Sequence, residues 1–148
     1  MSDVIEKIIP VNPFIKIPIG ALQAARDLIS DKVSYDSITV DTSESPVFID
    51  CGENLESINC PQCGAQISFE AWGELMNKAY ESSFMDLDVI LPCCNSKASL
   101  NDLKYKDECG FSRCVISILN PQNTIDDDLQ ESIEFLLRTK IKIVHAHI

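Results

Sequence analysis

The sequence has few basic residues and a marked excess of acidic ones. Lysine and arginine number 12 against 23 aspartates and glutamates, which gives a formal net charge of −11. Because no segment is basic overall, little positive charge is available for binding nucleic-acid phosphates. The acidic balance instead favours solubility and attraction to basic partners. We therefore expect a protein partner, basic in charge, rather than a nucleic acid.

The sequence also lacks long apolar segments. No stretch approaches the roughly 18 continuous apolar residues that a membrane span needs. At the amino terminus, Asp3, Glu6 and Lys7 interrupt any apolar run long enough for a secretory signal. We expect a cytoplasmic protein with no membrane association, in a compartment where thiols stay reduced. Seven cysteines in such a protein favour metal binding over disulfides, and their odd number leaves at least one unpaired.

Motifs of the common enzyme classes are missing as well. There is no glycine-rich phosphate loop, no HExxH helix and no serine nucleophile elbow. Pro92-Cys93-Cys94 lacks the PCxxC spacing of the zinc deaminases, and neither histidine is followed two residues later by a glutamate. We therefore expect that the protein is not an enzyme.

Length and periodicity point to one domain with its own core. The 148 residues, 45% of them hydrophobic, suit a single domain over residues 1–148. Apolar residues at three- and four-residue steps predict helices after Gly20, over about residues 70–84 and over about residues 125–138. Alternation predicts strands near residues 5–11, 87–91, 113–119 and 140–148.

Residues 37–50 carry a further strand signal. Two β-like pieces, 37–40 and 47–50, flank a polar stretch that closes at Pro46, and this composition predicts a hairpin with its turn at residues 41–46. The chain ends in the order strand, helix, strand, and its opening is similar. We therefore predict an α+β fold: a two-layer sandwich of ferredoxin-like β-α-β halves, with a zinc-ribbon-like module at residues 58–104 between them.

Cys60-Pro61-Gln62-Cys63-Gly64 is the most informative stretch. Two residues between cysteines let a tight turn aim both sulfurs at one ion, and the glycine permits the left-handed backbone that presents amide donors to the thiolates. The same spacing serves thiol oxidoreductases, which place it at the start of a helix. Here a β-like segment, 64–68, follows the second cysteine. This context favours a metal site over redox chemistry.

A four-coordinate site needs two more ligands, and Cys93-Cys94 is the best candidate pair. Like the first pair, it follows a strand and a proline and precedes a polar turn. Adjacent cysteines in an extended strand point to opposite faces, so both can bind one ion only inside a turn. We predict a structural zinc ion held by Cys60, Cys63, Cys93 and Cys94.

The remaining candidate ligands have simpler interpretations. Cys109 and Cys114 form the competing pair for the zinc, but Cys114 alternates with the apolar residues of its strand and is interpreted as a core thiol. Cys51 has no predicted role beyond packing. His145 and His147 share a face of the last strand and could hold a metal, although no carboxylate pattern accompanies them. The Asp126–Asp128 run is interpreted as a solvated helix start, because it lacks the spacing of a calcium loop.

The CPxCG segment resembles the knuckle of zinc-ribbon and rubredoxin-like proteins over those five residues. Several strings from the middle of the chain to its end also resemble small uncharacterised bacterial proteins that contain a zinc ribbon. These strings are Cys60-Pro-Gln-Cys-Gly, Leu91-Pro-Cys-Cys, Ser99-Leu-Asn-Asp-Leu, Gly110-Phe111 and Val144-His-Ala-His-Ile. The resemblance implies that the zinc module and the sandwich form one unit, and it implies no activity.

Three functions remain open at this point. The first is a non-catalytic binding module shaped by zinc, with a bacterial immunity or antitoxin-like role as one version. The second is a nucleic-acid-associated zinc ribbon that uses Lys97, Lys104 and Lys106. The third is a metal-dependent enzyme, which requires an open position on the zinc. The acidic charge and the missing catalytic motifs favour the first.

Overall fold

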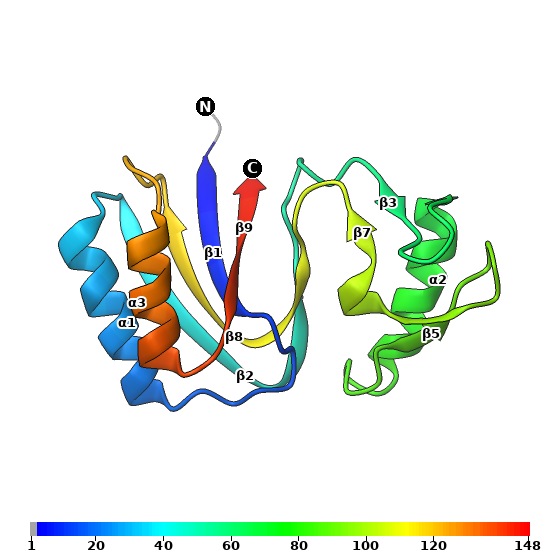
Figure 1. Cartoon of the computed structure of the whole chain (residues 1–148), viewed down its shortest axis with the longest axis horizontal. Helices are drawn as coiled ribbons and strands as arrows, with labels where there is room; N and C mark the ends of the chain where they lie inside the picture. The colour runs from blue at the N-terminus through cyan, green and yellow to red at the C-terminus, as the bar shows by residue number, and fades with distance from the viewer. Residues whose placement is uncertain (1–2) are drawn as a thin grey trace.

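A four-stranded antiparallel sheet forms the base of the fold. The structure is a computed structural model that describes residues 3–148. The strands lie in the order β2-β8-β1-β9 (Figure 1). Their bounds are β1 (Val4–Pro10), β2 (Ser37–Ile49), β8 (Gly110–Leu119) and β9 (Ile141–His147). Every neighbouring pair in this sheet is antiparallel.

Helices α1 (Ile19–Lys32) and α3 (Asp127–Leu137) lie side by side and cover one face of this sheet (Figure 1). Each helix has an apolar stripe that packs against alternate residues of the strands, as the periodicity predicts. The core between the two layers includes Leu22, Ala25, Ile29, Leu129, Ile133, Leu137, Ile8, Ile116 and Ile118. Cys114 belongs to the same core, so its interpretation as a core thiol is confirmed.

Residues 37–49 form one long strand rather than the predicted hairpin. Both pieces of β2 pair with β8 in the same direction, and the register shifts between Thr42 and Val47. The polar stretch therefore makes a bulge instead of reversing the chain. Pro46 is tolerated because β2 lies at the edge of the sheet, where a missing N–H need not disrupt a ladder.

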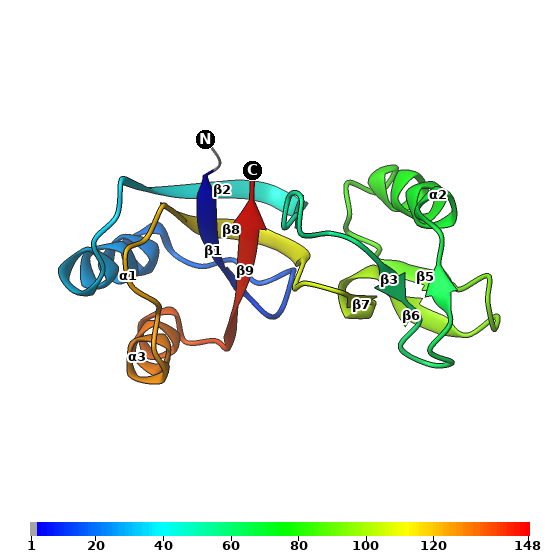
Figure 2. The ribbon, with the colours of Figure 1, turned by 90° about the horizontal axis from the view of Figure 1, so that it is seen from above.

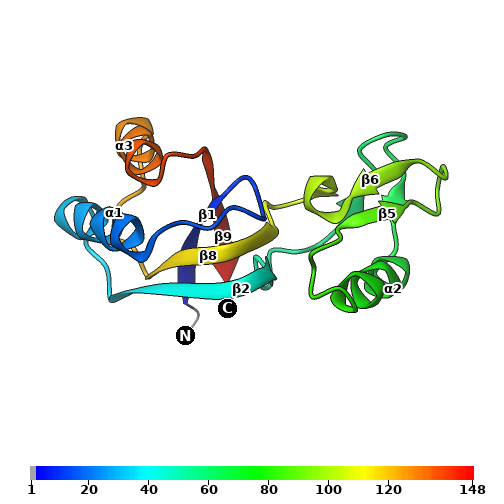
Figure 3. The same ribbon diagram turned by 90° about the horizontal axis from the view of Figure 1, so that it is seen from below.

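The segment between β2 and β8 forms a smaller module at the opposite end of the molecule from α1 and α3 (Figures 2 and 3). It contains one helix, α2, and two small sheets, ordered β4-β3-β7 and β5-β6. The bounds are β3 (Ile58–Asn59), β4 (Gln66–Ile67), α2 (Phe69–Tyr80), β5 (Asp88–Ile90), β6 (Lys97–Ser99), the 3-10 turn η1 (Leu100–Asp102) and β7 (Lys104–Tyr105). Residues 3–148 contain three helices, one large sheet and two small sheets, which is the predicted α+β class.

Helix α2 is shorter than the prediction of residues 70–84. Ser68 caps its start, because the serine side chain accepts a hydrogen bond from the backbone N–H of Ala71 at 3.1 Å. The helix ends at Tyr80, and the left-handed backbone at Ser83 and Phe84 follows it. No helix within residues 3–148 has the length and apolar content to span a membrane.

Aromatic side chains join the module to the sheet. Phe48 of β2 and Phe111 of β8 have ring centroids 5.2 Å apart, and the Phe48 ring also lies 5.5 Å from that of Trp72 on α2. Phe111 is fully buried and belongs to the core of the module. The strands that enter and leave the module therefore contribute to its core, and aromatic pairs of this geometry add to the stability of such a contact.

The loop that follows β2 contacts the end of the edge strand β9. Gly52 forms a parallel bridge with His147, and the backbone N–H of Glu53 donates to the His147 carbonyl at 2.9 Å. Gly52 has a φ of +62°, and a Cβ there would lie 2.5 Å from that carbonyl oxygen. Glycine is required at this position because only a residue without a side chain fits so close an approach.

The acidic start of α3 gives a stability test. Asp126 is the N-cap, and its side chain accepts a hydrogen bond from the backbone N–H of Leu129 at 2.8 Å. We expect Asp126→Ala to lower the free energy of unfolding by about 1 kcal/mol, measured by urea denaturation. The matched control is Asp127→Ala in the first turn, which loses only a favourable interaction with the helix dipole, about 0.5 kcal/mol. Equal losses in the two variants would contradict the assignment of the cap.

Candidate metal centre

Four cysteine side chains converge at the tips of two hairpins in the module. Cys60 and Cys63 lie in the turn between β3 and β4, and Cys93 and Cys94 lie in the turn between β5 and β6. The four Sγ atoms all lie within 4.8 Å of one another. Within residues 3–148, this is the one group of three or more histidine, cysteine or acidic side chains close enough to hold a metal ion.

The sulfur separations suit a tetrahedral ion. Cys60 Sγ lies 3.8 Å from Cys94 Sγ, Cys63 Sγ lies 3.5 Å from Cys93 Sγ, and the sulfurs of Cys93 and Cys94 are 3.9 Å apart. Four zinc–sulfur bonds of about 2.3 Å at tetrahedral angles would place the sulfurs about 3.8 Å apart. The four thiols could therefore hold one ion such as zinc.

The first turn has the hydrogen bonds of a metal-binding knuckle. The backbone N–H groups of Gln62 and Cys63 donate to Cys60 Sγ at 3.3 and 3.4 Å. The N–H of Gly64 donates to the carbonyl of Cys60 at 3.0 Å, and the N–H of Cys60 donates to the carbonyl of Ala65 at 2.8 Å. Gly64 has a φ of +79°, which is the left-handed backbone that the sequence predicts for this glycine.

The second turn repeats the same backbone hydrogen-bond pattern, with its two cysteines at different positions. The N–H of Asn95 donates to the Leu91 carbonyl at 2.8 Å, and the N–H of Leu91 donates to the Ser96 carbonyl at 2.9 Å. Asn95 has a φ of +57° at the position that Gly64 occupies in the first turn. Asparagine tolerates the left-handed region better than most residues other than glycine. The two turns are therefore equivalent, position by position.

This equivalence explains why the second pair lacks the usual C-x2-C spacing. Leu91 stands where the first turn has Cys60, and both side chains are fully buried in the core of the module. Cys94 stands where the first turn has Cys63. Cys93 occupies the place of Gln62, so the sulfur that Leu91 cannot provide comes from the third position of the turn. Adjacent cysteines can share an ion here because both lie inside a turn rather than a strand.

Cys60 and Cys93 differ in acidity, and the cause is different for each. The backbone N–H of Cys63, together with that of Gln62, stabilises the Cys60 thiolate and lowers the pKa of this thiol to about 6. Desolvation, followed by contacts with the neighbouring thiols, raises the pKa of Cys93 to about 12. Four adjacent thiols ionise together only when a cation compensates their charge, and a bound metal ion deprotonates its thiol ligands.

The other predicted candidates lie elsewhere. Cys109 does not join Cys114, which lies under the helices; it contacts Cys51, with their sulfurs 3.1 Å apart. The sequence gives no signal for the contact between Cys51 and Cys109, since they lie 58 positions apart and follow no motif. His145 and His147 face different glutamates: His145 Nδ1 lies 2.8 Å from Glu6, and His147 Nδ1 lies 3.8 Å from Glu53.

Comparisons of the chain with protein-family models, with curated proteins and with solved structures found no match.

The equivalence of the two turns predicts a rescue experiment. We expect Cys93→Ser to weaken metal binding at least tenfold, because it removes one ligand. Adding Leu91→Cys to Cys93→Ser would supply a sulfur from the first position of the turn and recover most of the lost affinity. Zinc affinity is measured by competition with a chromophoric chelator.

The matched control for this rescue places the new thiol one residue earlier. Ile90→Cys combined with Cys93→Ser adds a cysteine whose side chain points to solvent, because Ile90 is 58% exposed. This control should bind zinc no better than Cys93→Ser alone. Rescue by the control, or no rescue by Leu91→Cys, would contradict the equivalence of the turns.

Proposed function

We propose that the protein is a non-catalytic binding protein whose middle module is ordered by one structural zinc ion. The observation that carries the proposal is the convergence of the sulfurs of Cys60, Cys63, Cys93 and Cys94 within 4.8 Å. Four thiolates in tetrahedral positions are the donor set of structural zinc sites. Zinc with four protein ligands has no open position for water or substrate, and this supports a structural rather than a catalytic role.

The architecture of the module supports a structural role for the ion. Its strands are only two or three residues long, and its two hairpins belong to separate sheets. Hairpins this short are marginal in water without additional support. A metal ion bound by both tips would join the two sheets at the edge of the module core, to which the buried Cys60 belongs.

The metal hypothesis makes a direct prediction. Purified protein should contain about one zinc per chain, and serine replacement of Cys60, Cys63, Cys93 or Cys94 should abolish or weaken binding. Cys114→Ser is the matched control, since this buried thiol packs under the helices and should not affect the metal content. Inductively coupled plasma mass spectrometry measures zinc and iron together. Less than half an equivalent of any metal, or a loss caused by Cys114→Ser, would contradict the hypothesis.

For the four-stranded sheet and the two helices that cover it, we infer a ferredoxin-like arrangement. Without the module, the chain runs β1-α1-β2-β8-α3-β9, and the sheet order is β2-β8-β1-β9. Each helix then connects two parallel strands that are separated by a third, antiparallel strand, which is the pattern of two split β-α-β halves. In this interpretation, the zinc module is inserted between the halves at the β2–β8 connection.

The groove between the outer sides of α1 and α3 supports a role in protein binding. Phe135 projects there with 83% of its surface exposed, beside the partly buried side chains of Leu28 and Leu136. Asp128 and Glu131 line the same groove. An aromatic anchor with acidic neighbours suits a basic protein surface, because aromatic residues are frequent anchors of interfaces and opposite charges speed association.

Charge pairing within the module favours this hypothesis over a nucleic-acid function. Lys97 lies 3.6 Å from an Asp88 oxygen, and Lys106 pairs with Glu56. Two of the three lysines that would contact phosphates therefore face carboxylates. A bacterial immunity or antitoxin-like protein that neutralises a basic toxin is one concrete version of the proposal.

The partner hypothesis is tested by affinity capture with three forms of the protein. A basic protein should be retained by the wild type, and Phe135→Ser should weaken its binding about 30-fold, as expected for an anchor worth roughly 2 kcal/mol. Tyr80→Ser is the matched control, because Tyr80 is 70% exposed on α2 in the module. Equal binding by all three forms, or retention of nucleic acid alone, would contradict the proposed surface.

A further inference from the structure

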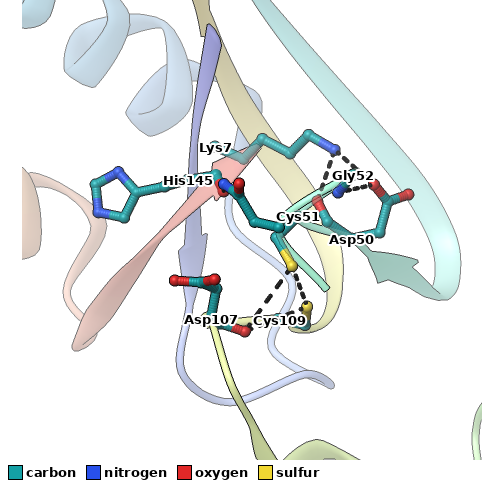
Figure 4. Close-up of polar contacts among 8 residues, drawn as sticks. Lys7, Asp50, Cys51, Gly52, Asp107, Cys109 and His145 are labelled. Atoms are coloured by element: carbon teal, nitrogen blue, oxygen red, sulfur yellow. Dashed lines mark hydrogen bonds and ion pairs between the residues drawn. The ribbon is translucent and has the colours of Figure 1, made fainter. Parts of the chain in front are cut away.

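Cys51 and Cys109 face each other where the module joins the sheet. Their sulfurs are 3.1 Å apart, and the two residues are 0% and 1% exposed (Figure 4). Both thiols also point toward one acceptor, the backbone carbonyl of Asp107, at 3.9 and 3.6 Å. They pack with Ile9, Ile49 and Val144 in a small core of their own. This pair has no part in the candidate metal centre.

The position of the pair in the fold follows from the pairing of β2 with β8. That ladder ends with Ile49 opposite Gly110. Cys51 lies just beyond the end of β2, and Cys109 lies just before the start of β8. The two cysteines therefore mark where the chain leaves the sheet for the module and where it returns.

The geometry is that of two thiols rather than of a second metal site. The sulfurs are closer together than the Cys60–Cys94, Cys63–Cys93 and Cys93–Cys94 pairs of the four-cysteine cluster, which are 3.5–3.9 Å apart. No third ligand joins them, since the metal-site geometry within residues 3–148 is met by the other four cysteines alone. Figure 4 shows the ring of His145 pointing away from the pair.

We propose that Cys51 and Cys109 are the site of an intramolecular disulfide that forms when the protein meets a peroxide. One thiol loses its proton, and the thiolate attacks a peroxide oxygen, which breaks the O–O bond and leaves a sulfenic acid on that sulfur. The hydroxide that departs takes up the proton and becomes water. The second thiol then attacks the sulfenic sulfur, forms the S–S bond and releases a second water. In sum, two thiols and one hydrogen peroxide give one disulfide and two waters. Bond formation requires the sulfurs to approach from 3.1 Å to about 2.0 Å.

Burial sets the conditions under which this reaction takes place. Desolvation, followed by the contact with Cys51, raises the pKa of Cys109, so the thiol form dominates and little reactive thiolate is present. Because the sulfurs are screened from solvent, a small uncharged oxidant reaches them more readily than a bulky thiol reductant. The disulfide should therefore form slowly and should also resist reduction by glutathione.

The disulfide would close the segment that contains the whole module. Closure of so long a loop restricts the unfolded chain, which stabilises the folded state. The segment by which the chain leaves the sheet and the segment by which it returns would then be covalently joined. This restraint does not depend on a metal ion. The disulfide proposal can therefore fail while the proposed zinc site is correct, and the reverse.

The first experiment identifies the bond. Zinc-supplemented protein is treated with hydrogen peroxide, unfolded, alkylated without reduction and digested for mass spectrometry. We expect a linked peptide that contains Cys51 and Cys109 and a mass lower by two hydrogens than that of the two separate thiol peptides. Cys114→Ser, the control, should give the same linked peptide, and Cys51→Ser should not. Alkylation of both Cys51 and Cys109 after peroxide treatment, or a link to another cysteine instead, would overturn the proposal.

The second experiment measures the consequence in the wild-type chain. Protein with the bond and protein without it are compared by thermal unfolding after removal of metal with a chelator. We expect the oxidised form to unfold several degrees higher, because its unfolded state is more restricted. An equal or lower midpoint for the oxidised form would overturn the stabilising role.

Discussion

The convergence of four thiol groups from two turns about thirty residues apart is the feature on which the proposed role of metal in the module depends. Neither hairpin is long enough to be stable alone, and each presents its cysteines from a tight turn with a left-handed residue in the fifth position. A cation at the centre would remove the repulsion between the thiolates and join the two hairpin tips. In the proposed account, this coordination joins the two hairpins, and the apolar core that includes Cys60 packs beside it.

Strand pairing, aromatic packing and backbone hydrogen bonds attach the module to the four-stranded sheet. The β2–β8 ladder continues to Ile49 and Gly110, and Phe48 and Phe111 extend from these strands into the module core. The loop after β2 then bonds to the end of β9 through Gly52 and Glu53. Phe48 packs against both the core of the module and the small core that contains Cys51 and Cys109, so the module is in contact with the end of the sheet. The proposed partner groove lies on the far helices, so the module and the groove occupy different ends of the molecule.

Much of the fold follows from local signals in the sequence. Alternation and helical periodicity place β8, α3 and β9 correctly, and the acidic run at Asp126–Asp128 does start a helix. The hairpin predicted at residues 37–50 is wrong, because the polar stretch around Pro46 is compatible with both a turn and a bulge. Pairing with β8, which lies about seventy residues away in sequence, selects the bulge. Local turn chemistry cannot reveal such a distant partner.

The candidate site shows the same division between local and distant information. The CPxCG spacing is local, and so the sequence reveals the first turn. The second turn is less regular because Leu91 replaces a cysteine, and its equivalence to the first turn appears only in the backbone hydrogen bonds. Contact between Cys51 and Cys109 depends on the β2–β8 register and could not be inferred from spacing. The partner groove likewise arises only when α1 and α3 pack together.

X-ray absorption spectroscopy at the zinc edge tests the central claim most directly. The spectrum of the zinc-loaded protein should fit four sulfur ligands at about 2.3 Å and no lighter ligand. A first shell that contains nitrogen or oxygen, or fewer than four sulfurs, would mean that the two turns do not share one closed site. The proposed basis of the module would then be wrong.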